Sequence, residues 1–556
     1  MIKQHLAKLL TLALALAMII TAGCAQKSAD SPASPGKKLK FPQGVESFAI
    51  DDDTGGYLQQ FGPLSNLVVI SHDPDNFKAE YEAGYIQGRL QKGQLTATRD
   101  NLWDTIARVD PGYPKNVPPT TTETATAKKM LIDNWNYTIE WVQRASDSKT
   151  KERLSRLIYR LVGIYDGATK AAPTAGELAT ARLPKTERFS PEELTLNYES
   201  PTVSFLDVYF INAVADLMDA MDNKFSRSKC SAYIKRTSNE IYLAHNSWFS
   251  FLDQSMASTY QINDTFVTVN ALSPGNILSN TDFGYNANGI MFNETTELAT
   301  HSEPKVEALW MLWRGALAEQ FAATLDEFFE LTSLEGSGTY MNGYGLIDMK
   351  TQEIGLVEMT WKDFILFKSN KTGGYDTRTK PEGLPTGYDH ELIQPDVILG
   401  VNFPASLYVR EQIQSIENRP MRRQQFLARM DTVTDVASAQ ALITYTAPGE
   451  PLSIYGRWDL GFGTTPKPKT IPEGSVDAKV VTASRAKASI PKAPGLTSSQ
   501  TQPFFWMKYG TPVFEPPPAG GGKPFIWSES QWSNQKLRQV PDVVTGEWAP
   551  IAPELN

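Results

Sequence analysis

The chain has 556 residues, a formal net charge of −9 at pH 7 and only two cysteines. This acidic balance argues against a nucleic-acid partner, because proteins that bind nucleic acid depend on a basic surface. The chain has five histidines, and no two of them lie at ligand spacing, so we expect no metal and no cofactor. Hydrophobic residues make up 41% of the chain and charged residues 21%, which indicates a globular protein.

The first residues have the pattern of an export signal. Two lysines precede an apolar run from Leu9 to Ile20, which is too short to span a membrane comfortably. The following "TAGC" resembles the cleavage box of bacterial lipoproteins, in which the cysteine, here Cys24, carries the lipid. Thr21 stands where leucine is usual in that box. A plain signal peptide that happens to contain Cys24 is the alternative.

This pattern predicts how the chain begins after export. We expect residues 1–23 to be removed, Cys24 to be lipidated and residues 24–40 to form a flexible tether of small and polar residues. The protein would then be anchored to a membrane of the bacterial cell envelope. Cys230 would have no disulfide partner within the chain.

Residues 41–229 are predicted to be mainly helical. The segments with helical character are "FKAEYEAGYIQGRLQ", "ERLSRLIYRLVGIYDG" and "VSFLDVYFINAVADLMDAM", and the second has apolar residues at i, i+3 and i+4. In the first segment, Tyr81, Gly84, Tyr85 and Gly88 share one face. The glycines on this face would let another element pack closely.

Strands are predicted to predominate from Cys230 onward. "CSAYIKRT" and "EIYLAHNSW" flank a turn-like "SNE" and predict a hairpin, and "GIMFNETTEL", "YGLIDMK" and "IGLVEMTW" predict further strands. One long helix is expected in "EPKVEALWMLWRGALAEQFAATLDEFFELT". Residues 464–503 predict an irregular crossing that contains one strand, "GSVDAKVV". Separate helical and strand runs indicate the α+β class.

Cys230 has unusual surroundings for an isolated cysteine. Such a residue is most often a small buried hydrophobe. Cys230, however, follows the polar "SRSK" and opens a predicted strand, and the partner strand carries His245, Asn246 and Ser247. A thiol at the start of a strand that faces polar groups has the arrangement that a nucleophile needs.

"KCSAYIK" followed by "YLAHNSW" resembles the phospholipase B-like family of N-terminal-nucleophile (Ntn) hydrolases. Further similar segments occur in the family's order along the chain: "AEYEAGYIQG", "NETTE", "SGTYMNGYGLIDMK", "VNFPAS", "ENRPMRRQQ", "GSVDAKV" and "PFFW". The chain lacks the extra cysteines of animal members, and residues 464–503 are only loosely similar. The resemblance implies a four-layer αββα sandwich of two mostly antiparallel sheets. Its catalytic core would span residues 230–556, and residues 41–229 would form a helical precursor segment.

The resemblance also implies self-cleavage between Lys229 and Cys230. In such enzymes the thiol attacks the preceding carbonyl, an N-to-S acyl shift gives a thioester, and water releases it. The two fragments stay associated. The new α-amine of Cys230 then serves as general base, because its pKa of about 8 lies close to that of a thiol, about 8.5.

Residues on two strands are implied to complete the site. His245 stands where the related bile-salt and penicillin hydrolases carry arginine, and is expected to orient the amine or bind substrate. Asn246 is expected to contact the amine or the oxyanion of the tetrahedral intermediate. Thr295 and Thr296 are expected to line the site, and Thr296 is the closer match. Each also has an ordinary structural explanation, since threonine is simply a good strand former.

Two further candidate site residues lie in the later segments that resemble the family. Asn402 is implied to contribute to an oxyanion hole or to orient the amine; alternatively it is a turn residue before Pro404. Arg419 is implied to be a structural or catalytic arginine, with Arg422 as the alternative.

The function implied by the resemblance is hydrolysis of acyl groups from phospholipid or another acyl lipid through a Cys230 thioester. One alternative is a cell-envelope amidase that acts on N-acylated molecules. The other is an exported lipoprotein that only binds lipid or glycan through its 12 Trp, 21 Tyr and 25 Phe residues.

Overall fold

The computed structural model describes residues 39–106, 118–173, 186–221, 230–263, 266–369, 374–417, 420–447, 453–456, 473–490, 504–510, 524–530 and 532–552. The elements below all belong to the compact unit Leu39–Asn556. Within the described ranges, no helix is both long and apolar enough to cross a membrane.

An eleven-stranded sheet forms one half of the core. Its strand order is β1-β2-β3-β6-β7-β8-β9-β10-β11-β12-β13, and all neighbours are antiparallel except β3 and β6. The strands are β1 (Glu46–Ala49), β2 (Gly55–Phe61), β3 (Leu64–Ser71), β6 (Met256–Ile262), β7 (Phe266–Leu272), β8 (Phe283–Asn286), β9 (Ile290–Thr296), β10 (Asn342–Asp348), β11 (Glu353–Met359), β12 (Phe364–Ser369) and β13 (Tyr375–Lys380).

An eight-stranded sheet forms the other half. Its order is β14-β15-β4-β5-β16-β17-β19-β18, with antiparallel neighbours throughout. The strands are β4 (Ser231–Arg236), β5 (Ile241–Ser250), β14 (Ile393–Gln394), β15 (Val397–Gly400), β16 (Glu473–Thr482), β17 (Phe505–Gly510), β18 (Phe525–Ile526) and β19 (Val543–Ile551).

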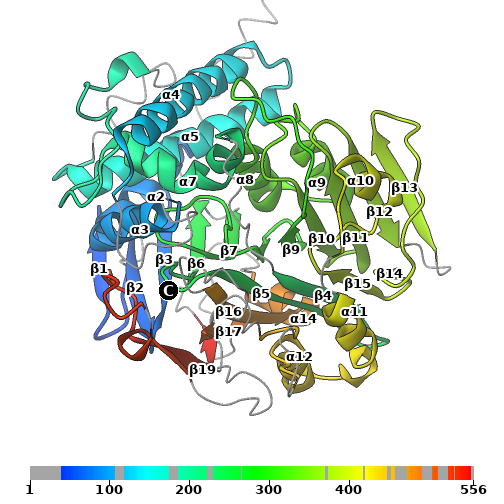
Figure 1. Ribbon diagram of the computed structural model, residues 1–556. Coiled ribbons are helices and arrows are strands. Elements are labelled where there is room, and N and C mark those ends of the chain that lie inside the picture. Colours follow the sequence, from blue (N-terminus) through cyan, green and yellow to red (C-terminus); the bar gives the residue numbers. More distant parts are fainter. Residues whose placement is uncertain are drawn as a thin grey trace, which may run out of the picture. The chain divides into compact units, whose positions relative to one another are not determined.

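Helices cover the outer faces of both sheets (Figure 1). They are α2 (Asn76–Leu90), α3 (Lys92–Ile106), α4 (Thr121–Arg144), α5 (Ser148–Thr169), α7 (Phe205–Ala220), α8 (Met311–Phe321), α9 (Leu325–Thr332), α10 (Leu407–Gln412), α11 (Pro420–Leu427), α12 (Val436–Ile443) and α14 (Ala483–Ser489).

The layers follow from the packing partners of these elements. Helix α2 lies on β2, β3 and β6, and α8 and α9 lie on β8, β10 and β12 of the eleven-stranded sheet. Helices α12 and α14 lie on β5 and β16 of the eight-stranded sheet. The two sheets face each other where β4 and β5 meet β9, and where β15 meets β10 and β11. The predicted α+β class and αββα layering are therefore confirmed.

One sequence-based expectation about the elements needs correction. The helix expected over residues 303–332 is two helices, α8 and α9. Helix α8 begins at Met311 because the Asp216 carboxylate accepts hydrogen bonds from the backbone N–H groups of Met311 (2.8 Å) and Leu312 (3.0 Å). The side chain of Thr324 accepts a hydrogen bond from the backbone N–H of Glu327 and so caps the N-terminus of the second helix, α9.

The segment expected to be mainly helical also contains strands. Its first part forms β1, β2 and β3, and β3 is buried on both faces beside β6. Within residues 464–503 the structure describes 473–490, where the predicted strand is present as β16 and is followed by α14. The remainder of that expected crossing lies outside the described residues.

Helices α2 and α5 pack unusually closely through glycines. A Cβ atom added to Gly84 or Gly88 of α2 would overlap the carbonyl oxygen of Arg160 or Ile164 of α5. Glycines of α5 face the backbone of α2 in the same way: Gly163 and Gly167. The expectation that the first predicted helix packs closely through its glycine face is confirmed.

This contact gives a first prediction. Gly88→Ala forces the two helix backbones apart, so we expect it to lower the free energy of unfolding by about 1–3 kcal/mol, the usual cost of overpacking. Gly93→Ala on α3 is the control, because its new methyl group meets only the end of the Gln539 side chain and alanine favours a helix. Equal thermal unfolding midpoints for the two variants would contradict the packing account.

Candidate active site

Cys230 lies at the head of β4, near the centre of the eight-stranded sheet. Its side chain is fully buried. In the β4–β5 pair, Ser231 lies opposite Asn246 and Ala232 lies opposite His245. Strand β5 also pairs with β16, which places Lys479 opposite His245. The hairpin predicted from the sequence thus brings the thiol and the histidine together, and β16 adds a lysine beside them.

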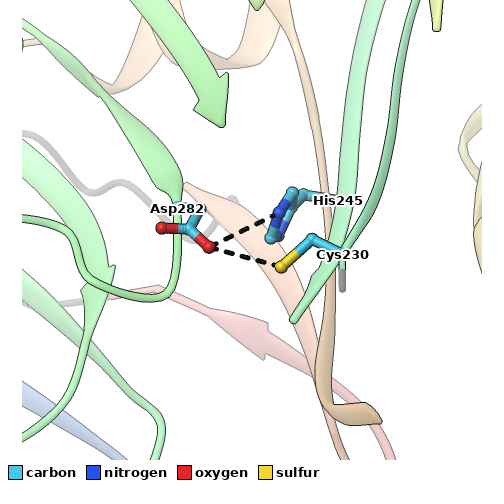
Figure 2. A group of neighbouring side chains, drawn as sticks. All are labelled: Cys230, His245 and Asp282. Carbon is cyan, nitrogen blue, oxygen red and sulfur yellow. Dashed lines mark hydrogen bonds and ion pairs between the residues drawn. The ribbon is translucent and has the colours of Figure 1, made fainter. Parts of the chain in front are cut away.

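The Cys230 thiol points at a carboxyl group (Figure 2). Its Sγ atom donates a hydrogen bond to Oδ2 of Asp282 over 3.5 Å. The same oxygen lies 3.9 Å from Nε2 of His245. The sulfur, imidazole and carboxylate all come from buried residues. Asp282 therefore links Cys230 and His245, the two residues that the sequence predicts, although no sequence pattern points to Asp282 itself.

Asp282 lies in the turn before β8, with a positive φ of 66°. Aspartate and asparagine tolerate this left-handed region better than most residues, because a short polar side chain can hydrogen-bond locally. The backbone N–H of Asp282 donates to the Ser279 carbonyl (3.1 Å), and its carbonyl accepts from the N–H of Glu294 on β9 (3.1 Å). Both sides of the turn are therefore held while the side chain faces the sulfur.

Asp282 and Glu294 form a buried carboxyl pair. The hydroxyl of Tyr340 donates toward both, at 3.2 Å from Asp282 Oδ1 and 3.3 Å from Glu294 Oε2. Burial raises the pKa of Asp282 to about 7. Burial, and then the charge of Asp282, raises the pKa of Glu294 well above its usual range. Two adjacent buried carboxyls do not both ionise at neutral pH, so the pair holds a proton, mainly on Glu294.

The thiol and the imidazole are both neutral in the intact chain. Burial, and then the nearby Asp282 and Glu294, raises the pKa of Cys230 well above its usual range; a hydrogen bond from the backbone N–H of Trp248 opposes this only in part. Burial, and then the positive charge of Lys479, lowers the pKa of His245 well below its usual range, and a backbone group of Glu294 near the ring opposes this only in part. Among the described residues, neither ring nitrogen of His245 has a partner at good hydrogen-bond geometry.

The same three residues have the donor atoms of a metal site. Sγ of Cys230, an imidazole nitrogen and a carboxylate oxygen lie within 4.8 Å of one another. Three such ligands are the number that a catalytic zinc site uses. In this structure the thiol instead donates a hydrogen bond to the carboxylate, and we interpret the group as a proton-transfer cluster.

Lys479 fixes the turn that carries Asp282. Its Nζ lies 2.7 Å from Oδ1 of Asp477 and 2.7 Å from Oγ of Ser247, and also donates to the carbonyl of Thr281. Lys479 and Asp477 are both completely buried, so each requires the other's charge. Because Thr281 directly precedes Asp282, this ion pair holds the turn in place.

Asn246 holds the strand ends around the thiol. Its Oδ1 accepts from the backbone N–H of Ser231 (3.1 Å) and from Nε1 of Trp248 (2.5 Å). Its Nδ2 donates to the carbonyls of Ile443 and Ile454, both at 3.0 Å. Both N–H groups of this amide thus donate to backbone carbonyls rather than to Cys230. Asn246 therefore holds the backbone around the thiol in position.

Arg422, on α11, joins the start of β4 to the segment after β15. Its guanidinium donates to the carbonyl of Cys230 and to Oγ of Ser231 (3.2 Å), and on its other side to the carbonyl of Val401 and to Oδ1 of Asn402 (3.1 Å). Asn402 has a positive φ of 59°, and its Nδ2 donates to the carbonyl of Thr296 (2.7 Å).

Thr295 and Thr296 lie on opposite faces of β9, as neighbouring residues of a strand must. Thr295 contacts Gly400 of β15, between the sheets. Thr296 lines a pocket together with Tyr340, and its Oγ1 has no hydrogen-bond partner among the described residues. Of the two predicted threonines, Thr296 is therefore the one beside the Asp282–Tyr340 group.

Three residues selected from the sequence lie outside the described residues: Cys24, Lys229 and Arg419. The sequence does not predict the other residues of the site, although most lie within the segments that carry the family resemblance. Glu294 is in "NETTE", Tyr340 is in "SGTYMNGYG", and Asp477 and Lys479 are in "GSVDAKV". Asp282, in "SNTDFGYN", had no such signal, because an aspartate in a turn is ordinary.

Arg422 gives a second prediction. The ammonium group of Arg422→Lys cannot span the carbonyls of Cys230 and Val401, which two different guanidinium nitrogens reach. At least one buried carbonyl loses this donor, so we expect the substitution to lower the free energy of unfolding by about 2–3 kcal/mol. Arg423→Lys is the matched control on the same helix, since Arg423 makes partly exposed ion pairs with Asp389 and Glu417 and should cost less than about 1 kcal/mol. Denaturant unfolding of both variants measures the difference, and equal losses would contradict this role.

The sequence comparisons with known proteins agree on one family. The family model described as Phospholipase B matches residues 68–548. Phospholipase B-like 1 of Rattus norvegicus is 25% identical over 325 residues, which are 53% of this chain and 50% of that protein. Phospholipase B-like 1 of Bos taurus is 26% identical over 34% of this chain and 35% of that protein. The chain thus spans half or less of these two relatives.

A third relative is matched over a greater length. Phospholipase B of Crotalus adamanteus is 23% identical over 474 residues, which are 78% of this chain and 76% of that protein. Among solved structures, a penicillin V acylase from Agrobacterium tumefaciens has 11% identity and a TM-score of 0.27, over 52% of this chain and 84% of that one. That similarity is too low to bear on function. The family match over residues 68–548 is decisive, and the chain belongs to the phospholipase B family.

Proposed function

We propose that the protein is an exported, self-processing cysteine hydrolase that removes acyl groups from lipid esters through a thioester on Cys230. The observation that carries the proposal is the position of the Cys230 thiol, 3.5 Å from the Asp282 carboxyl at the head of a strand. Family membership supports hydrolysis, and the names of the relatives favour acyl lipids as substrates. In this proposal Cys24 carries the membrane anchor.

Self-cleavage needs a base before any α-amine exists. In the intact chain the nitrogen of Cys230 belongs to a peptide bond, and burial keeps the thiol protonated. Asp282 is the group in position to accept the thiol proton, which passes to Oδ2 as Sγ bonds to the carbonyl carbon of Lys229. When the C–N bond breaks, the proton moves to the departing nitrogen. Water then splits the thioester into the Lys229 carboxyl group and the free thiol.

Turnover repeats this chemistry on the substrate. The α-amine of Cys230 takes the thiol proton, the sulfur attacks the acyl carbonyl, and the leaving alcohol takes up the proton. Water hydrolyses the resulting acyl thioester. His245 and Thr296 have unused hydrogen-bonding groups, whereas the amides of Asn246 and Asn402 donate to backbone carbonyls. We therefore assign the stabilisation of the oxyanion to His245 and Thr296.

A third prediction tests the nucleophile. Cys230→Ser should lower the hydrolysis of acyl esters by about 100-fold or more, because a serine hydroxyl is a much weaker acid and nucleophile than a thiol. Cys24→Ser is the matched control, and should release the protein from membranes with turnover unchanged. Ester hydrolysis by Cys230→Ser at the rate of the wild type would contradict the mechanism. A wild-type protein that binds lipid without any turnover would favour the binding lipoprotein instead.

A fourth prediction concerns the pH dependence of self-cleavage. A base acts only when deprotonated, and burial raises the pKa of Asp282 to about 7. The cleavage rate should therefore fall about tenfold per pH unit below pH 7 and level off above it, rather than near pH 4 as for an ordinary aspartate. Quenched samples from a freshly refolded precursor, separated on denaturing gels, give the rate.

Asp282→Asn separates this role from a structural one. The variant should cleave at least 100-fold more slowly, because the amide cannot accept the thiol proton. A site-specific protease that cuts directly before Cys230 should restore ester hydrolysis to it. Normal self-cleavage in Asp282→Asn would refute the assignment of the base.

A further inference from the structure

The three donor atoms around the nucleophile are spaced as the ligands of a zinc ion are. Sγ of Cys230 lies 3.5 Å from Oδ2 of Asp282, and Nε2 of His245 lies 3.9 Å from the same oxygen (Figure 2). Zinc bond lengths in a tetrahedral site place sulfur and oxygen ligands about 3.6 Å apart, and nitrogen and oxygen ligands about 3.4 Å apart. Both separations are therefore within about 0.5 Å of those that zinc requires.

His245 supplies a second observation that points to a ligand. Its ring is completely buried, and among the described residues neither nitrogen has a partner at good hydrogen-bond geometry. Buried polar atoms are normally satisfied, and a metal ion beside the thiol and the carboxylate would satisfy one of these nitrogens. A backbone group of Glu294 lies near the ring. Metal-bound histidines commonly use such a group to fix the orientation of the ring.

The charges around the cluster match a divalent cation. The thiolate of Cys230 and the carboxylate of Asp282 would neutralise a bound Zn²⁺, so the site would bury no net charge. The buried cation nearby, Lys479, is already matched by Asp477, whose Oδ1 lies 2.7 Å from its Nζ. When zinc binds, the thiol proton leaves for the solvent as the zinc–sulfur bond forms.

A pocket leads toward this buried cluster. It is lined by residues of helices α3 and α7 and by Thr296 and Tyr340. The Tyr340 hydroxyl donates to Oδ1 of Asp282 over 3.2 Å. The pocket therefore reaches the residue that contacts the carboxylate ligand, which gives an ion a route of entry.

Self-cleavage would add a fourth donor to the three side chains. In the intact chain the nitrogen of Cys230 is an amide, whose lone pair is delocalised into the carbonyl. The α-amine that cleavage creates has a free lone pair, and it can bind the same ion as its own sulfur in one chelate ring. A structural zinc site has four such ligands in a tetrahedron, so the amine would close the coordination.

We propose that Cys230, His245 and Asp282 form an inhibitory site for a thiophilic divalent cation, best matched by Zn²⁺, and that the α-amine of Cys230 completes it. The three side chains are given by the geometry alone, whereas the amine and the inhibition rest on the proposed function. A bound ion occupies both the nucleophile and the amine that serves as base. The metal-free cluster is therefore the working state, and the occupied cluster is blocked.

Cobalt(II) tests the site without any turnover. The mature protein with Cys24→Ser is used, because Cys230 is then the one thiol of the chain. Co²⁺ should produce the charge-transfer absorption of a cobalt–thiolate bond, which saturates at a single equivalent, and Zn²⁺ should remove it. Absence of this absorption would overturn the inference, and no variant of the cluster has to fold for that result.

A histidine variant shows which imidazole binds. His245→Gln should weaken the binding of Co²⁺ about tenfold or more, because a ligand is lost. His301→Gln is the matched control, since the His301 ring packs against Trp361 and is not among the three donors; it should bind Co²⁺ as the parent does. Equal binding by the two variants would contradict the proposed ligand set.

Asp282→Asn isolates the amine, because this variant is expected to stay uncut until a site-specific protease cleaves directly before Cys230. The cut changes no side chain of the cluster and creates the α-amine. Co²⁺ should therefore bind about tenfold more tightly after the cut than before it. Equal affinity before and after the cut would overturn the assignment of the fourth donor.

Hydrolysis of acyl esters gives the last readout. A small molar excess of zinc chloride should lower turnover about tenfold or more, and a chelator should restore it. Magnesium chloride is the control, because Mg²⁺ prefers octahedral oxygen ligands. Equal effects of the two salts would overturn the inhibitory role. A cobalt–thiolate absorption in a protein without turnover would support the metal site and refute the proposed function, so the two failures are distinguishable.

Discussion

The site depends on one constraint, the burial of ionisable groups around a thiol. Cys230, His245, Asp282 and Glu294 are each almost completely removed from solvent. Burial penalises the charged form of every group, so the thiol and imidazole are neutral and two carboxyls hold one proton between them. A thiol in such an environment is inert until a neighbour removes its proton. In the proposed mechanism Asp282 does so, because it has both the position and a raised pKa.

The rest of the fold fixes this arrangement in space. Strands β4, β5 and β16 place Cys230, His245 and Lys479 side by side. The Lys479–Asp477 pair anchors the turn before Asp282. Arg422 and Asn246 occupy the hydrogen-bonding groups of the strand ends. These supporting residues are satisfied largely by backbone groups, whereas His245 and Thr296 at the site keep atoms without a partner among the described residues. The outer helices complete the fold and line the pocket.

Much of the architecture could be predicted from the sequence, because periodicity and turn residues act locally. The β4–β5 hairpin, helices α2, α5 and α7, and strand β16 all carried a clear pattern. The break between α8 and α9 could not be predicted in the same way. It depends on Asp216, whose carboxylate caps α8 from about 95 residues away in the sequence. Likewise β3 joins the sheet through a parallel pairing with β6, which local pattern does not reveal.

The same distinction applies to the site. His245 and Asn246 were found because they lie on the strand paired with β4. The sequence predicts Arg419 first and Arg422 only as the alternative, since spacing alone does not say which arginine faces the strand. Asp282 was missed, because its role arises from a turn that folding brings to the sulfur.

The most direct measurement is the intact mass and N-terminal sequence of the mature protein, purified after export and separated under denaturing conditions. The account predicts two polypeptides, of which the larger begins at Cys230. A single polypeptide with an intact Lys229–Cys230 bond that still hydrolyses acyl esters would contradict it.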